Sequence, residues 1–178
     1  FQTMLKQNPD MCFLTETHAT EDKIQGYVQE WKKMGGTDAY FGKAPSSSEQ
    51  GVAILFGRNF APVPSNIKES TPGRSISMEI DLAKKKHTLL ATYAPTIPAA
   101  RSQFFNDIVT NETTTNQVVW SGDYNCVEDG DLDRIGPPQI HHLRGAVEIR
   151  RYKDIHKLVV CGCLCIFGFR PLPLGGGF

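Results

Sequence analysis

The sequence predicts an α/β protein in which helices cover sheets, and three observations support this fold class. Residues 11–14 and 51–56 are continuous apolar runs of strand length, typical of strands buried on both faces. Residues 75–82 alternate between apolar and polar side chains, as a half-exposed strand does, and residues 87–93 return as its hairpin partner. Segments with the helical spacing of apolar residues lie between these strands and supply the covering helices.

The expected elements follow one another with recognisable start and stop signals. Asp22 and Gln25 form an N-cap pair for a helix that the glycines at 35–36 end. Two prolines within residues 60–69 favour an irregular edge strand. The other expected elements are a helix ending near Gln7, a turn at 84–87, a helix over 99–110, a strand over 117–120 and a helix over 139–150.

The composition is that of a single domain without a strong overall charge. The chain has 178 residues, enough to bury a sizeable core, and its 19 basic residues balance 19 acidic ones. Binding to a polyanion must therefore come from a local patch. Lys84, Lys85 and Lys86, together with Arg134, are the candidate nucleic-acid-binding residues, although a solvated hairpin tip explains the lysines equally well.

Cysteine usage and hydropathy indicate the compartment. The five cysteines are an odd number without the spacing of a disulfide framework, which favours a reducing environment. No secretory signal opens the sequence, and no apolar run approaches the ~18 residues of a membrane helix. We therefore expect an intracellular protein, nuclear or cytoplasmic, that is not secreted and has no membrane partner. The sequence starts without Met, in what reads as a helix already under way, so we expect a fragment.

Four polar residues directly follow apolar strands, where ligands gather in layered α/β folds. Glu16 is a candidate metal-binding carboxylate, although loop acids more often cap the next helix. The Tyr93 hydroxyl can donate to a phosphate oxygen, although a ring packed in the core is commoner. Asp123 and Asn125 lie two residues apart and so face the same side of a strand end. They suit positioning of a water and a phosphate around a hard metal ion, although a simple Asx turn is frequent there.

Taken in chain order, the strand ends form one pattern. It runs through Leu14-Thr15-Glu16-Thr17-His18, Gly51-Val52-Ala53-Ile54-Leu55, Ala91-Thr92-Tyr93-Ala94-Pro95, Ser121-Gly122-Asp123-Tyr124-Asn125-Cys126 and Leu132-Asp133-Arg134. This pattern resembles the exonuclease-endonuclease-phosphatase superfamily (DNase I-like), and within it the apurinic-type endonuclease domain of LINE-like retrotransposons. The resemblance covers roughly residues 1–157.

The resemblance implies a four-layer α/β sandwich that cleaves a phosphodiester with a divalent metal. It implies that Glu16 binds Mg²⁺, or Mn²⁺ in its place, and that Tyr93 contacts the scissile phosphate. Asp123 would orient or deprotonate the attacking water, and Asn125 would hydrogen-bond the phosphate. The implied partner is DNA, nicked by a protein in which the endonuclease is fused to a reverse transcriptase that the new 3′ hydroxyl primes.

The sequence also departs from the superfamily pattern. The first strand, with an Asn at the metal site, would precede Phe1, and the Asp–His pair expected near the carboxyl end is not found. We therefore expect a fold truncated at both ends and a site without most of its activity, since catalytic groups act as a unit. Residues 1–157 would form the partial domain. Residues 158–178 carry a single Arg and no acidic residue, and we expect them to be an atypical tail outside the fold.

Two other functions stay open at this level. A superfamily phosphatase acting on inositol phosphates or sphingomyelin would share these motifs. The short segment Leu132-Asp133-Arg134 and the Glu16-Thr17-His18 motif favour the endonuclease over that alternative. A noncatalytic remnant or interaction module would retain only the fold.

Overall fold

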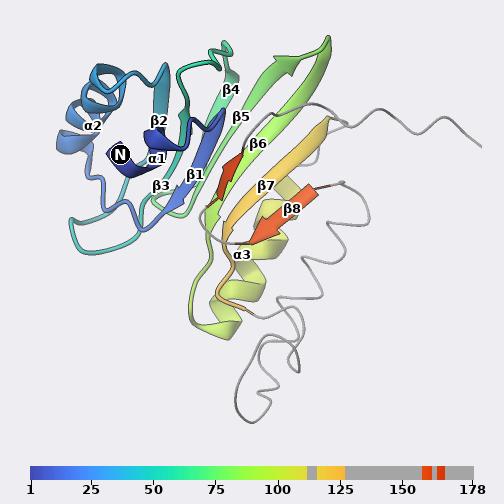
Figure 1. The fold of residues 1–178 in the computed structure, drawn as a ribbon. Helices are drawn as coiled ribbons and strands as arrows, with labels where there is room; N and C mark the ends of the chain where they lie inside the picture. The colour runs from blue at the N-terminus through green and yellow to red at the C-terminus, as the bar shows by residue number, and fades with distance from the viewer. Residues whose placement is uncertain (112–115, 127–157, 162–163, 167–178) are drawn as a thin grey trace, which may run out of the picture.

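The computed structural model describes residues 1–111, 116–126, 158–161 and 164–166, the last two ranges by their backbone. In chain order the elements are α1 (Gln2–Lys6), β1 (Met11–Thr15), α2 (Glu21–Lys33), β2 (Asp38–Gly42), β3 (Val52–Phe56), β4 (Ser65–Thr71), β5 (Ser75–Leu82), β6 (Lys85–Tyr93), α3 (Pro98–Asn111), β7 (Gln117–Asp123), β8 (Leu158–Cys161) and β9 (Leu164–Ile166). Figure 1 shows two sheets side by side, with α1 and α2 beside one sheet and α3 beside the other.

The strands form two sheets, in the orders β2-β3-β1-β9 and β4-β5-β6-β7-β8. The first sheet is antiparallel, with Phe13 of β1 opposite Ile54 of β3. In the second sheet β5 and β6 form the expected antiparallel hairpin, whereas β6 and β7 are parallel and need the crossover that α3 supplies. Parallel pairing brings the carboxyl ends of β6 and β7 to one edge, where Tyr93 and Asp123 are direct neighbours in register.

The alternation of side chains along the strands builds the layers. One face of each sheet contributes to a shared core, which holds Met11, Phe13, Val52, Ile54, Phe56, Ile76, Met78, Ile80, Leu89, Ala91 and Val119. The opposite face of the first sheet packs against Leu5 of α1 and Trp31 of α2. The opposite face of the second sheet packs against Phe104, Phe105 and Ile108 of α3. The order helix, sheet, sheet, helix confirms the predicted α/β sandwich.

Several element boundaries differ from the sequence expectation. The hairpin turn consists of Ala83 and Lys84, whose φ values of 48° and 63° are those of a two-residue type I′ turn. Lys85 and Lys86 therefore belong to β6 and not to the turn. The helix α2 begins at Glu21 with Thr20 at its N-cap, so Asp22 lies in the first turn and does not cap.

The predicted half-exposure of residues 75–82 was wrong, and the structure also contains a strand that the sequence analysis did not predict. The strand β5 is buried on both faces over Ser75–Met78: Ile76 and Met78 face the shared core, and Ser75 and Ser77 on the opposite face are also buried. The strand β2 was not expected, because Asp38–Gly42 has only a short apolar stretch between polar and glycine residues. Pairing with β3 fixes the extended conformation of β2, which its own sequence does not predict.

The carboxyl-terminal segment contributes backbone pairing to both sheets. The strand β8 runs parallel to β7, and β9 runs antiparallel to β1. These two strands lie within residues 158–178, which the sequence analysis placed outside the fold; the domain boundary at residue 157 itself stays a prediction. The helix expected over 139–150 and the candidate residue Arg134 lie outside the described residues.

Within the described part of the chain, no helix combines the length and apolar character that crossing a membrane requires.

Candidate functional site

Three strand ends meet at one end of the sandwich and bring the predicted site residues together. Glu16 directly follows β1 of the first sheet, while Tyr93 and Asp123 end β6 and β7 of the second sheet. The Tyr93 hydroxyl donates a hydrogen bond of 2.7 Å to Oε1 of Glu16. This contact spans the two sheets, so the site depends on how the sheets stack and not on either sheet alone.

The loop after β1 is shaped so that Glu16 stands out from the sheet. Glu16 and His18 both have left-handed φ values, of 53° and 51°. The Thr17 and His18 amides donate to the carbonyls of Gly51 and Gln50, at 3.1 and 2.9 Å. Left-handed conformations at residues other than glycine carry strain and cluster at functional sites. The Glu16 side chain is exposed as a result, with its carboxylate available to solvent.

The Asp123–Asn125 segment forms an Asx turn, and this turn also holds the two candidate site residues in place. Oδ1 of Asp123 accepts the Asn125 backbone amide at 2.9 Å, which is an Asx turn. Nδ2 of Asn125 donates to the Ala94 carbonyl at 2.7 Å, and the Ala94 amide donates to the Asp123 carbonyl at 2.8 Å. The turn therefore fixes Asp123 and Asn125 against the segment after Tyr93, and both side chains stay half-buried.

Gly122 is the residue that allows β7 to approach β6 closely at the site. A Cβ atom at this position would overlap the carbonyl oxygen, carbonyl carbon and nitrogen of Thr92 on β6. These are backbone atoms of a paired strand and have no rotamer by which to move away. The close approach of β7 to β6 therefore requires a glycine directly before Asp123.

The other three predicted site residues all influence the pKa of Tyr93. The pKa of Tyr93 lies above its ordinary value of 10.0, first because the hydroxyl donates to Glu16. Burial and the negative charges of Glu16 and Asp123 raise this pKa further, whereas a hydrogen bond from Asn125 opposes the rise. The geometry agrees for the two carboxylates: Glu16 accepts the Tyr93 hydroxyl, and Asp123 lies beside Tyr93 in the register of β6 and β7.

The Tyr93 pKa gives a direct prediction. In a spectroscopic pH titration, the difference between the chain and Tyr93→Phe should show a tyrosine that ionises above 10.0. Glu16→Gln should bring that ionisation back toward the ordinary value, because glutamine carries no charge. A raised folded pKa means that the associated stability is present below the unfolded value and is lost as pH rises through the folded one. Because glutamine can still accept the hydroxyl, an unchanged titration in Glu16→Gln would contradict the contribution of the Glu16 charge to the Tyr93 pKa.

A polar cavity of about 420 Å³ opens beside Glu16 and Tyr93. Sequence reasoning missed two of its cationic or titratable members, Arg74 and His18. The Arg74 guanidinium lies 5.5 Å from the Tyr93 ring centroid, and its Nη1 donates to the Tyr93 carbonyl at 3.2 Å. The Pro72-Gly73 turn before Arg74 was the available signal, since it places an arginine at the start of a strand. The remaining lining residues are Ser48, Glu49, Gln50 and Thr96.

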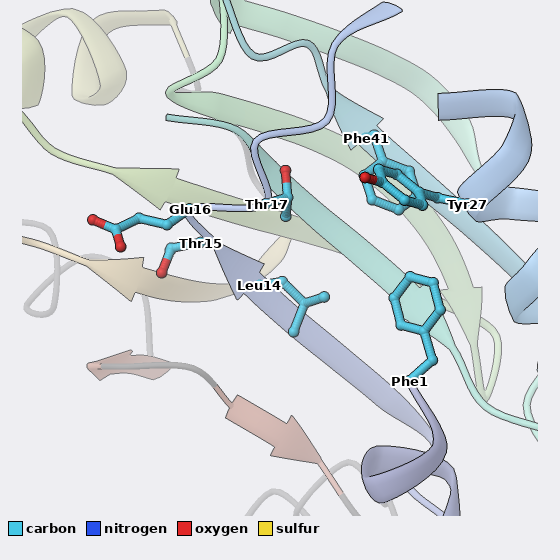
Figure 2. Close-up of a pocket in the computed structure, with 7 residues that line it drawn as sticks. All are labelled: Phe1, Leu14, Thr15, Glu16, Thr17, Tyr27 and Phe41. Carbon is cyan, nitrogen blue, oxygen red and sulfur yellow. The ribbon is translucent and has the colours of Figure 1, made fainter. Parts of the chain in front are cut away.

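A second cavity, of about 300 Å³, is also lined by Glu16 and is mainly apolar. Its aromatic wall consists of Phe1, Tyr27 and Phe41. Figure 2 shows that Glu16 extends away from this aromatic group while Leu14 faces it. Glu16 thus lines both cavities, and its carboxylate points away from the aromatic wall.

The described members of the predicted basic patch, Lys84, Lys85 and Lys86, lie away from this site. Lys84 and Lys85 lie at the turn end of β6, whereas Tyr93 lies at the other end, a separation of about 26 Å along an extended strand. Lys86 forms an ion pair of 3.5 Å with Asp81. The exposed lysines are a solvated hairpin end in this structure, and a role in nucleic-acid binding stays a prediction.

The donor set fits a magnesium ion held mainly by water. Mg²⁺ is bound by oxygen ligands and keeps several waters, so one or two carboxylates suffice. Glu16 offers an exposed carboxylate at the cavity, and no described residue pairs with its second oxygen. No group of three or more His, Cys, Asp or Glu side chains gathers in a metal-binding arrangement among the described residues. The fit is to a hard, water-rich ion and not to a closed structural metal site.

Comparison with solved structures identifies the fold. The chain has a DNase I-like fold, which confirms the fold that the resemblance implied. It is similar to the human Nocturnin catalytic domain with bound sulfate (15% identity, TM-score 0.52), covering 69% of this chain and 54% of that one. It is also similar to D. rerio TDP2 complexed with a single-strand DNA product (16% identity, TM-score 0.51), covering 70% and 51%.

One curated sequence is similar to this chain. The chain is similar to the Transposon TX1 uncharacterized 149 kDa protein of Xenopus laevis, with 28% identity over 122 residues. The match covers 67% of this chain but 9% of that protein, and the chain spans about half of the two solved structures. No protein-family model matches the sequence.

Proposed function

We propose that the chain carries the site of a Mg²⁺-dependent phosphodiesterase that nicks DNA, the activity of a retrotransposon endonuclease. The observation that carries this proposal is the hydrogen bond between Tyr93 and Glu16, with Asp123 in register beside Tyr93. A carboxylate, a phenol and a second carboxylate thereby share one end of the sandwich. The similarity to a transposon protein supports the retroelement origin, and the DNA-bound structural neighbour supports a nucleic-acid substrate.

Each side chain has a proposed part in hydrolysis. Glu16 would hold Mg²⁺ or Mn²⁺, which when bound neutralises charge that develops on the phosphate oxygens. The Tyr93 hydroxyl would donate to a non-bridging phosphate oxygen. Asp123 would accept a proton from the attacking water as its oxygen bonds to phosphorus. The bond from phosphorus to the 3′ oxygen then breaks, that oxygen takes up a proton, and Asn125 keeps the phosphate oriented.

The wider setting is proposed on the same basis. The partner would be DNA, bound through its phosphodiester backbone, in an intracellular compartment, either the nucleus or the cytoplasm. In the full protein, the endonuclease would be joined to a reverse transcriptase that extends the nicked strand. We also propose, as the sequence analysis expected, that this chain taken by itself has lost most of its activity and is close to inactive.

A plasmid-nicking assay tests the activity. With Mg²⁺ and supercoiled DNA, we expect slow nicking that a chelator abolishes and that Asp123→Ala lowers about tenfold. The loss is modest because groups that act as a unit contribute little singly when turnover is already slow. Asp107→Ala is the control, since Asp107 is an exposed acid on α3 that hydrogen-bonds only Gln103 among the described residues.

The outcomes separate the candidate functions. Equal background nicking by the chain and by Asp123→Ala would remove the enzyme interpretation for this chain and favour a noncatalytic remnant. Release of phosphate from inositol phosphates, without any nicking, would instead favour the phosphatase alternative. Nicking that persists in the presence of chelator would contradict the metal requirement.

A further inference from the structure

Arg101 is a buried, charged residue that takes no part in the proposed hydrolysis. It lies in the first turn of α3, and 1% of its surface is exposed. Its Nη1 donates to the carbonyl oxygens of Pro95 at 3.5 Å, Thr96 at 3.2 Å and Asn125. Pro95 and Thr96 follow Tyr93, whereas Asn125 follows β7. One guanidinium nitrogen therefore joins the two loops that border the site.

Stability does not account for an arginine at this place. A buried guanidinium is costly unless its donors are satisfied, and Nε and Nη2 of Arg101 have no hydrogen-bond partner among the described residues. No carboxylate of the described part forms an ion pair with it. A cation in the first turn of a helix also opposes the helix dipole. An apolar side chain of similar length would fill this position at least as favourably.

We propose that Arg101 is a positioning residue that clamps the Asn125 loop to the Pro95–Thr96 segment, an inference that rests on the proposed function. Asn125 has a left-handed φ of 48° and needs its surroundings to hold it there. Its amide is bound by Asp123 and its side chain by the Ala94 carbonyl. Arg101 holds the remaining backbone group, the carbonyl, and so completes the fixation of this loop.

Amide hydrogen exchange in the whole chain tests the clamp without any need for activity. In Arg101→Met, exchange at the Ala94 and Asn125 amides should become about tenfold faster, while exchange in the central strand β3 should not change. Arg101→Lys should be intermediate, since an ammonium retains the charge but not the fork of donors. Arg58→Met is the control, because Arg58 is exposed and follows β3 at the end remote from Gly51. Wild-type exchange at Asn125 in Arg101→Met would overturn the proposal.

A kinetic measurement tests the consequence for the site. If the clamp positions Asn125, Arg101→Met should lower kcat of plasmid nicking about tenfold with little change in KM, and Arg101→Lys should restore part of the loss. Faster exchange at Asn125 with unchanged kcat would also overturn the positioning role. Should the wild-type chain show no metal-dependent nicking, the proposed function fails, and the exchange measurement alone decides whether the clamp exists. Should Arg101→Met not fold, Arg101→Lys decides it by the same exchange criterion.

Discussion

Glu16→Gln is expected to weaken binding of Mg²⁺ or Mn²⁺ by on the order of 100-fold or more. Glutamine has almost the same shape and its side-chain oxygen can still accept the Tyr93 hydroxyl, so the fold should be retained. The loss comes from charge: a hard cation that is bound mainly through waters relies on the one or two carboxylates that it contacts. Replacement of partners outside the first coordination shell already lowers metal affinity by about 10–100-fold, so loss of a direct ligand should exceed that. Calorimetric titration with Mn²⁺ measures the effect.

The matched control is Glu49→Gln. Glu49 is an exposed glutamate that lines the same cavity and carries the same charge, but the Tyr93 hydrogen bond belongs to Glu16. If the cavity attracts cations only through its overall charge, the two variants should lose affinity equally. If Glu16 is a direct ligand, Glu49→Gln should change the affinity by no more than about threefold, as expected for a screened charge at the surface. Equal losses in both variants would refute the assignment of Glu16.

The strands that carry the site were predictable because of how they are buried. Residues of β1 and β3 meet the core on one face and helices on the other, so their sequences are apolar without interruption. Uninterrupted apolar runs of this kind can be recognised from a single amino-acid sequence. The strand β2 was not predictable in this way, because Asp38–Gly42 depends on pairing with β3 for its conformation. The same reasoning applies to Ala83 and Lys84, whose turn geometry is imposed by the hairpin.

The candidate site was predictable where it depends on strand ends and not where it depends on stacking. Glu16, Tyr93 and Asp123 each follow an apolar run, and their order matches a known pattern. His18 follows β1 and reaches Tyr93 only when the two sheets pack, whereas Arg74 directly precedes β5 and meets Tyr93 through the pairing of β5 with β6. The Glu16-Thr17-His18 motif and the Pro72-Gly73 turn mark these residues in the sequence, but neither signal predicts that both side chains line one cavity. The buried position of Arg101 could not be predicted for another reason. This residue lies inside a predicted helix, where an arginine ordinarily faces solvent.

Gly122→Ala is expected to lower the free energy of unfolding by about 3 kcal/mol, at the upper end of the range for overpacked positions. The added methyl group would overlap the backbone of Thr92, and both strands are paired on either side, so neither moves freely. For a chain of this size, that loss corresponds to a fall in Tm of roughly 6–12 °C. Thermal unfolding followed by circular dichroism measures it.

The matched control for Gly122→Ala is Gly26→Ala, which makes the same chemical change in open space. Gly26 is exposed within α2, and an added Cβ would have no atom within 4 Å. Alanine should therefore stabilise the chain by about 0.5–1 kcal/mol through helix propensity and the unfolded state. Opposite signs for the two substitutions would separate the steric demand at the β6–β7 contact from the general effect of replacing glycine. A stable Gly122→Ala variant would mean that β7 does not approach β6 as closely as described, and the placement of Asp123 beside Tyr93 would lose its structural support.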